Sequence, residues 1–152
     1  MTENVCFQIK RLTSNEVFLA KELAKMFGFT EGSKNQFFAS ENYVRQMLEK
    51  EDFHVIVALE NNKLIGGLTA YEMKMFKRET TEMFLYEIEV AENYRQKGVG
   101  KGLIEFLKEI CTTKGIVEMF VGTEKDNFPA KKLYSATGGM ADENSVWFNY
   151  EF

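Results

Sequence analysis

The chain has 152 residues, of which 45% are hydrophobic, and it contains 14 Phe, 6 Tyr and 1 Trp. This length suits one domain, and the apolar content is enough for a substantial core. The formal net charge of −4 argues against a nucleic-acid partner, which would need a basic face. With one His and two widely separated Cys, the sequence also argues against a metal site and a disulfide. We therefore expect a single domain over residues 1–152 that holds no metal.

Nothing in the sequence predicts insertion into a membrane. No window approaches the roughly 18 uninterrupted apolar residues of a membrane span. The N-terminal residues lack the apolar core of a secretory signal. We expect a soluble, cytoplasmic protein with no membrane partner.

Hydrophobic periodicity divides the chain into alternating helices and strands. In chain order, it predicts a strand over residues 5–12, helices over 17–27 and 42–50, strands over 53–59, 64–73 and 83–90, a helix over 99–114, a strand over 116–121, a helix over 130–137 and a strand over 146–152. Residues 29–40 mix polar and aromatic side chains and predict a loop. This order indicates an α/β domain in which a mixed sheet is flanked by helices and the strands over 83–90 and 116–121 are parallel.

Local signals define the ends of several elements. Ser14 or Asn15 can cap the first helix, while Gly28 and Gly115 follow the last turns of two helices. The tetrapeptide Glu60-Asn61-Asn62-Lys63 between two strands favours a hairpin. His54, at the start of a strand, and Cys111, on the apolar face of a helix, are interpreted as structural residues.

The loop between the strand over 83–90 and the helix over 99–114 is the most informative part of the sequence. It reads Arg95-Gln96-Lys97-Gly98-Val99-Gly100-Lys101-Gly102, so three glycines and three cations stand where a helix begins. Helix-start N–H groups have no intrahelical partner and attract anions, and glycine lets the backbone approach them. We expect a phosphate there. The spacing excludes GxxxxGK[ST], and Leu103 replaces the third glycine of GxGxxG.

The RxxGxG pattern after a strand resembles the pyrophosphate loop of the GNAT superfamily of N-acetyltransferases. A second motif follows at the expected distance, Asn127-Phe128-Pro129-Ala130-Lys131-Lys132-Leu133-Tyr134 with Gly138 after it, and it resembles the family pattern NxxAxxLYxxxG. The resemblance covers about residues 53–140. It implies a mixed, mostly antiparallel central sheet of six to seven strands flanked by about four helices, with acetyl-CoA as acetyl donor.

The branch that the chain resembles most is the aminoglycoside 3-N-acetyltransferase (gentamicin acetyltransferase) branch. The matching segments are Leu68-Thr69-Ala70-Tyr71 and Leu85-Tyr86-Glu87-Ile88-Glu89-Val90. The branch usually has Asp where Glu87 stands and a small residue where Glu89 stands, and Gly139 replaces an apolar residue. The resemblance implies acetylation of the 3-amino group of an aminoglycoside, and with it antibiotic resistance.

Acetyl transfer to an amine needs a base, a polarised carbonyl and a proton for the leaving thiolate. Glu87 is the expected base, with Glu89 as second choice because period two places both on one strand face unless a bulge intervenes. Tyr134 is the expected acid. The family resemblance assigns carbonyl polarisation to the backbone N–H groups of Ile88 and Val90.

The remaining site residues are expected to bind the cofactor. The backbone of Gln96, Lys97, Gly98, Val99, Gly100 and Lys101 would hold the pyrophosphate, and Arg95 and Lys101 would add charge. The resemblance implies that Asn127 bonds the pantetheine arm. Asn127 can also serve as a helix N-cap, and both roles can hold.

Several functions stay open at this point. The first expectation is direct attack in a ternary complex by a primary amine of a small cationic acceptor, an aminoglycoside. The alternatives are a polyamine N-acetyltransferase, a protein or peptide N-acetyltransferase, and a catalytically silent CoA-binding module. A homodimer is a further expectation, with the alternating segment over 146–152 as its contact.

Overall fold

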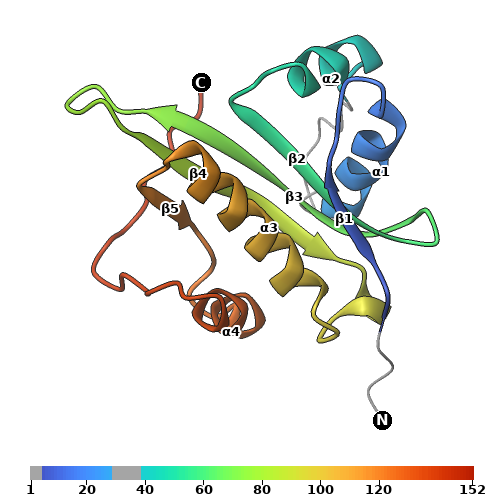
Figure 1. Cartoon of the computed structure of the whole chain (residues 1–152). Helices are drawn as coiled ribbons and strands as arrows, with labels where there is room; N and C mark the ends of the chain where they lie inside the picture. Colours follow the sequence, from blue (N-terminus) through green and yellow to red (C-terminus); the bar gives the residue numbers. More distant parts are fainter. Residues whose placement is uncertain (1–4, 29–38) are drawn as a thin grey trace. The chain divides into compact units, whose positions relative to one another are not determined.

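The computed structural model describes residues 5–28 and 39–152, and Figure 1 shows their arrangement. The loop predicted over residues 29–40 lies mostly outside this range. The elements are β1 (Gln8–Arg11), α1 (Val17–Phe27), α2 (Glu41–Leu48), β2 (Phe53–Glu60), β3 (Lys63–Lys74), β4 (Thr81–Val90), the 3-10 turn η1 (Glu92–Tyr94), α3 (Val99–Lys114), β5 (Glu118–Val121) and α4 (Phe128–Ala136). None of the described helices is long and apolar enough to cross a membrane.

The strands form one mixed sheet in the order β1-β2-β3-β4-β5. The first three pairings are antiparallel, and β4 and β5 are parallel, as the sequence predicts for a strand-helix-strand unit. The α/β class and the number of α-helices, four among the described residues, are therefore confirmed. The strand count is wrong, because the described residues form five strands rather than six or seven.

Helices cover both faces of the sheet, and two adjacent glycines show how closely they approach. A Cβ on Gly67 would lie 2.7 Å from a methyl group of Leu23 in α1. A Cβ on Gly66 would lie 3.3 Å from Val99 in α3. Since successive strand residues point to opposite faces, α1 and α3 pack on opposite sides of β3. We call these the α1 face and the α3 face.

Each face has its own apolar core. On the α1 face, buried residues from β2 and the two N-terminal helices pack together, among them Leu23, Leu48, Phe53, Val55 and Val57. On the α3 face, fully buried residues come from the central strands and from α3: Ile56, Leu68, Met83, Leu85, Leu103 and Leu107. Burying side chains of this size contributes about 1.5–3 kcal/mol each, which fixes the sheet between the helices.

Turns and caps follow the sequence signals with one exception. Gly28 and Gly115 end α1 and α3 with φ of 72° and 68°, and the hairpin residues Asn61 and Asn62 have φ of 49° and 64°. Positive φ at both central residues is typical of a type I′ turn. The cap predicted at Ser14 or Asn15 is wrong. The N-cap is Glu16, whose carboxylate accepts from the backbone N–H of Thr13 at 2.9 Å.

The strand predicted over residues 146–152 is also wrong. These residues form no regular secondary structure, and Val146, Trp147, Phe148 and Tyr150 are 71–82% exposed. Alternation of apolar residues describes a strand only where another strand pairs with its backbone. Contacts divide the chain into two compact units, residues 1–122 with the sheet and α1 to α3, and residues 123–152 with α4 and this C-terminal segment.

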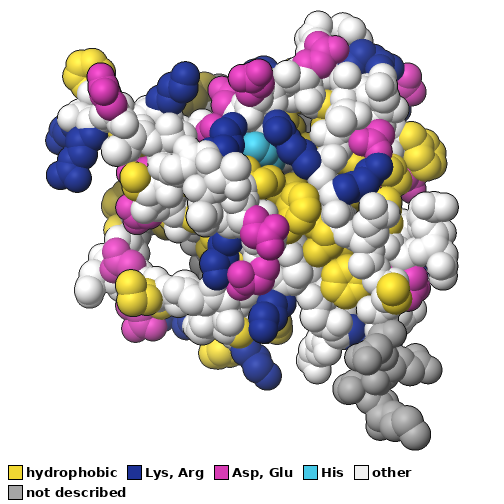
Figure 2. Space-filling view, in the orientation of Figure 1, with side chains coloured by type: hydrophobic (Ala, Val, Ile, Leu, Met, Phe, Trp, Pro, Cys, Tyr) yellow, Lys and Arg dark blue, Asp and Glu magenta, His cyan; other side chains and the backbone are white. Residues whose placement is uncertain are grey.

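His54 and Glu72 form a buried polar pair on the α3 face. The Nε2 atom of His54, which is 0% exposed, lies 2.6 Å from Oε1 of Glu72, and Nζ of Lys114 in α3 lies 2.5 Å from the same oxygen. Figure 2 shows basic side chains beside the single histidine, which is coloured cyan. The pair joins β2, β3 and the end of α3, as the structural interpretation of His54 predicts.

This pair predicts that acid destabilises the fold. Desolvation lowers the pKa of His54 below 6.5, although Glu72 opposes it. Desolvation raises the pKa of Glu72, but hydrogen bonds from Lys114 and His54 outweigh it and leave that pKa below 4.5. In both cases the unfolded chain binds protons at higher pH than the folded one, so stability is lost as pH falls, first below about 6.5 and then below about 4.5.

Urea unfolding at several pH values would measure this effect. The chain has one histidine, so the slope of the unfolding free energy near pH 6 belongs mainly to His54. The variant His54→Gln should flatten the slope there and keep the decline below about 4.5. A slope that is the same in both proteins would contradict the prediction.

Candidate active site

A β-bulge in β4 places the candidate base. The register pairs Ala70 with Leu85 but Thr69 with Glu87, so Tyr86 is the extra residue. Before the bulge Phe84 faces the same side as its partner Tyr71, and after it Glu87 and Glu89 take up that same α1 face. The bulge precedes both glutamates, so they share one face, as period two predicts.

Glu87 lies on this face as an exposed carboxylate in partly desolvated surroundings. Its packed neighbours raise its pKa above 4.5 by desolvation, and no neighbouring charge offsets the shift. A carboxylate with a raised pKa is a better proton acceptor than a fully hydrated one, which suits a general base.

Glu89, the second choice for the base, is already engaged. Its Oε1 accepts from an NH2 group of Arg95 at 2.9 Å and from the backbone N–H of Val90 at 3.2 Å. The Nε of Arg95 donates to the carbonyl of Val90 at 3.1 Å. Glu89 therefore positions Arg95 against the end of β4, where its carboxylate is less free than that of Glu87 to take a proton.

The end of β4 presents backbone donors with no strand opposite them. The pairing with β5 reaches only Leu85, so the edge beyond it lacks a neighbouring strand among the described residues. The N–H of Ala91 donates to Ile65 on the β3 side. Because donors alternate along a strand, the N–H groups of Ile88 and Val90 point the other way, toward the open edge. The N–H of Val90 donates there to Oε1 of Glu89 at 3.2 Å, and that of Ile88 faces the open edge.

The loop after β4 leads into α3, whose N-terminus carries no side-chain cap. Gly98 is the N-cap in the left-handed region, with φ of 85°, and no side chain caps the helix. The N–H groups of Val99, Gly100 and Lys101 belong to the first turn, where intrahelical partners are lacking. The turn before it is tightened by Gln96, whose φ is 59°. An uncapped helix start with no acidic residue in its first turn is a ready anion site.

The cations of this loop differ in their surroundings. Arg95 is bound to Glu89 and to the Val90 carbonyl, while Lys97 lies 5.9 Å from the ring centre of Tyr94. Lys101 is exposed on the first turn of α3. Lys97 and Lys101 thus keep their ammonium groups available to an anion at the helix start.

The second sequence motif forms α4, in the unit of residues 123–152. Oδ1 of Asn127 accepts from the N–H of Ala130 at 3.2 Å, so the cap role is confirmed, and its NH2 group remains a donor. Tyr134 is partly buried, and desolvation raises its pKa above 10, which keeps the phenol protonated at neutral pH. The other predicted site residues, from Glu87 to Lys101, belong to the unit of residues 1–122.

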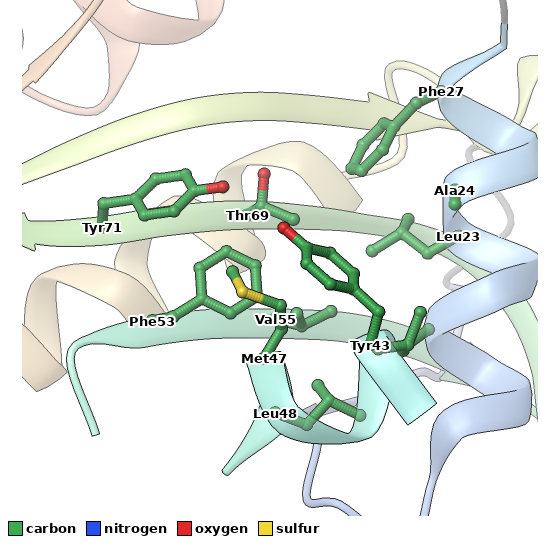
Figure 3. A pocket seen from close by; sticks show the side chains of 12 residues that line it. Leu23, Ala24, Phe27, Tyr43, Met47, Leu48, Phe53, Val55, Thr69 and Tyr71 are labelled. Carbon is green, nitrogen blue, oxygen red and sulfur yellow. The ribbon is translucent and has the colours of Figure 1, made fainter. Parts of the chain in front are cut away.

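A cavity of about 200 Å³ opens on the α1 face, and the sequence reasoning did not predict it. Its walls come from α1, α2, β2 and β3, and three hydroxyl side chains, Tyr43, Thr69 and Tyr71, line it among apolar residues. Figure 3 shows the hydroxyl groups of both tyrosines directed toward Thr69. The buried Oγ1 of Thr69 has no hydrogen-bond partner. The alternation of Thr69 and Tyr71 along a strand was the sequence signal that could have placed both side chains on one face, in the cavity wall.

No group of three or more His, Cys, Asp or Glu residues that could hold a metal lies in the described part of the chain. Both cysteines are free, Cys6 exposed and Cys111 buried.

Comparisons with known proteins identify the class. Residues 15–138 match the model of the acetyltransferase (GNAT) family. An aminoglycoside acetyltransferase from an uncultured soil metagenomic sample, solved in complex with sisomicin, is 30% identical, with a TM-score of 0.89 over 100% of this chain and 99% of that one. A second from such a sample is 32% identical, with a TM-score of 0.87 over 97% and 99%. No curated protein matches the chain significantly by sequence.

The chain belongs to the acetyltransferase (GNAT) family. It is an N-acetyltransferase that uses acetyl-CoA as donor. The aminoglycoside acetyltransferase AAC(6')-Iy, in complex with CoA, shares the fold at 21% identity, with a TM-score of 0.78 over 97% of this chain and 96% of that one.

Proposed function

We propose that the protein transfers an acetyl group from acetyl-CoA to a primary amine of an aminoglycoside. The observation that carries this proposal is the near full-length likeness, at 30% and 32% identity, to two aminoglycoside acetyltransferases. The geometry supports it, because Glu87, the outward-facing amides of Ile88 and Val90, of which Val90 donates to Glu89, and the open start of α3 follow one another along the chain.

In the proposed reaction, the acceptor attacks acetyl-CoA directly within a ternary complex. Glu87 takes a proton from the acceptor ammonium, and the free amine adds to the thioester carbon. The N–H groups of Ile88 and Val90 stabilise the negative oxygen that forms. The C–S bond then breaks, the thiolate takes the phenolic proton of Tyr134, and the nitrogen loses its second proton to the tyrosinate, which restores the phenol. The products are the acetylated amine and CoA.

The cofactor would be held by the loop before α3 and by α4. The backbone of Gln96 to Lys101 would bind the diphosphate, with Lys97 and Lys101 adding charge and Arg95 held near it by Glu89. The Asn127 NH2 group would donate to the pantetheine arm. Because the family model spans residues 15–138, both compact units contribute to its match, and we propose that they act as a single domain over residues 1–152.

We also propose which amino group of the aminoglycoside is acetylated. The resemblance of the Leu85 to Val90 segment favours the 3-amino group. NMR of the acetylated product would identify the position, and acetylation elsewhere on the ring system would reject the 3-amino assignment while keeping the aminoglycoside.

We further propose a cytoplasmic location, because unpaired cysteines suit a reducing compartment. A homodimer stays a prediction, supported by the exposed apolar segment 146–152. Light scattering after gel filtration should give twice the mass of the chain, and a monomer mass would contradict it.

A thiol-release assay with acetyl-CoA tests the function. Aminoglycosides should release CoA thiol faster than polyamines or N-terminal peptides at equal concentration. Faster thiol release with a polyamine or a peptide would show that this compound, and not an aminoglycoside, is the acceptor. Tight CoA binding without release by any amine would instead indicate the silent CoA-binding module.

A further inference from the structure

A row of aromatic rings crosses the α1 face, and its central member, Tyr86, directly precedes Glu87 in β4. Ring centres lie 4.8 Å apart between Phe53 and Tyr71, 5.9 Å between Tyr71 and Tyr86, and 5.5 Å between Tyr86 and Phe84. Phe84 stacks in turn on Phe120 of β5 at 4.9 Å. The row thus joins four strands, and Tyr86 stands at its centre.

Tyr86 is the exposed member of this row. It is the bulge residue of β4, and 56% of its surface is exposed. Its ring meets those of Tyr71 and Phe84 at 86° and 87°, so packing on both sides holds it upright. The Tyr86 ring, directly before the candidate base, is therefore already oriented before a ligand binds.

The electrostatics around this ring favour a cation. Desolvation raises the pKa of Tyr71, and the phenols of Tyr86 and Tyr43 and the carboxylate of Glu87 raise it further. No cation contributes to the raised pKa of Glu87. Tyrosine faces attract ammonium groups, and a carboxylate nearby strengthens the attraction.

We propose that Tyr86, supported by Tyr71, binds a second ammonium group of the acceptor, distinct from the one that Glu87 deprotonates. The inference rests on the proposed function and deepens it by naming a specificity-determining residue. It assigns to the site a preference for acceptors with two or more amino groups, because a single amine cannot occupy Glu87 and the tyrosine face together.

Calorimetry with sisomicin, an acceptor with several amino groups, tests the inference without turnover. The variant Tyr86→Leu removes the aromatic face, and Tyr86→Phe keeps it. A cation–π contact at an exposed site corresponds to about a two- to fivefold change in affinity. We expect Tyr86→Leu to weaken sisomicin binding by this factor and Tyr86→Phe to bind nearly as the wild type does. Phe18→Leu, on an exposed aromatic residue of α1, is the matched control and should change nothing.

A comparison with glucosamine, which carries one amino group, separates selectivity from general damage. The ratio of kcat/KM for sisomicin to that for glucosamine should fall in Tyr86→Leu and stay constant in Tyr86→Phe. Equal losses for both acceptors, no loss for either, or no sisomicin binding by the wild type would each overturn the inference. Sisomicin binding that depends on Tyr86, without thiol release, would refute the proposed function and leave the cation site standing.

Discussion

Glu87→Gln should lower kcat for aminoglycoside acetylation by about a hundredfold to ten-thousandfold, the range that a positioned general base contributes. The amide keeps the size of the side chain and cannot accept the proton of the ammonium group. The loss should shrink at high pH, where more of the acceptor is already unprotonated. Steady-state rates over a pH series, with acetyl-CoA saturating, would measure both effects.

Glu89→Gln is the matched control on the same strand face. Glu89 holds Arg95 and the Val90 amide, so its loss should alter the KM for acetyl-CoA more than kcat. The variant Glu87→Asp, which restores the residue usual in the branch, should recover part of the rate. If Glu89→Gln lost as much kcat as we expect for Glu87→Gln, the roles of the two residues would have to be exchanged.

Tyr134→Phe should lower the rate of the chemical step by about a hundredfold and leave the Kd for CoA nearly unchanged. The phenol supplies a proton to the departing thiolate but is not needed to hold the nucleotide. Single-turnover kinetics would measure the chemical step even where product release limits kcat, and calorimetry would measure CoA binding.

Tyr150→Phe provides the control, since Tyr150 lies in the same unit and is 82% exposed. It should leave both quantities unchanged. A single-turnover rate in Tyr134→Phe equal to that of the wild type would remove the acid role, and a large loss of CoA affinity would make Tyr134 a binding residue instead.

The parts of the fold that depend on local chemistry were predicted from sequence. The bounds of the helix Val99–Lys114 and its glycine cap follow from periodicity and from the αL preference of Gly115. The hairpin follows from two Asn residues that tolerate positive φ. The cap of α1 was missed because Glu16 turns back to the Thr13 N–H, and the strand over residues 146–152 was missed because alternation does not show whether another strand pairs with it.

The candidate site divides in the same way. The open helix start could be predicted from the glycines of residues 98–102, because a residue without a side chain leaves the backbone N–H groups beside it accessible. The bulge at Tyr86 was not visible, because a one-residue insertion arises from how two strands pair. Without that bulge, Glu87 would face α3 rather than α1.

The sequence by itself determined the periodicity, the turn residues and the two motifs that identify an acetyltransferase, since all of these act over a few neighbouring residues. Only the tertiary structure decided which glutamate stays free, which backbone amides face an open edge, and that aromatic rings from four strands form one row. These depend on strand register and on contacts between residues far apart in the chain, which local propensities do not specify.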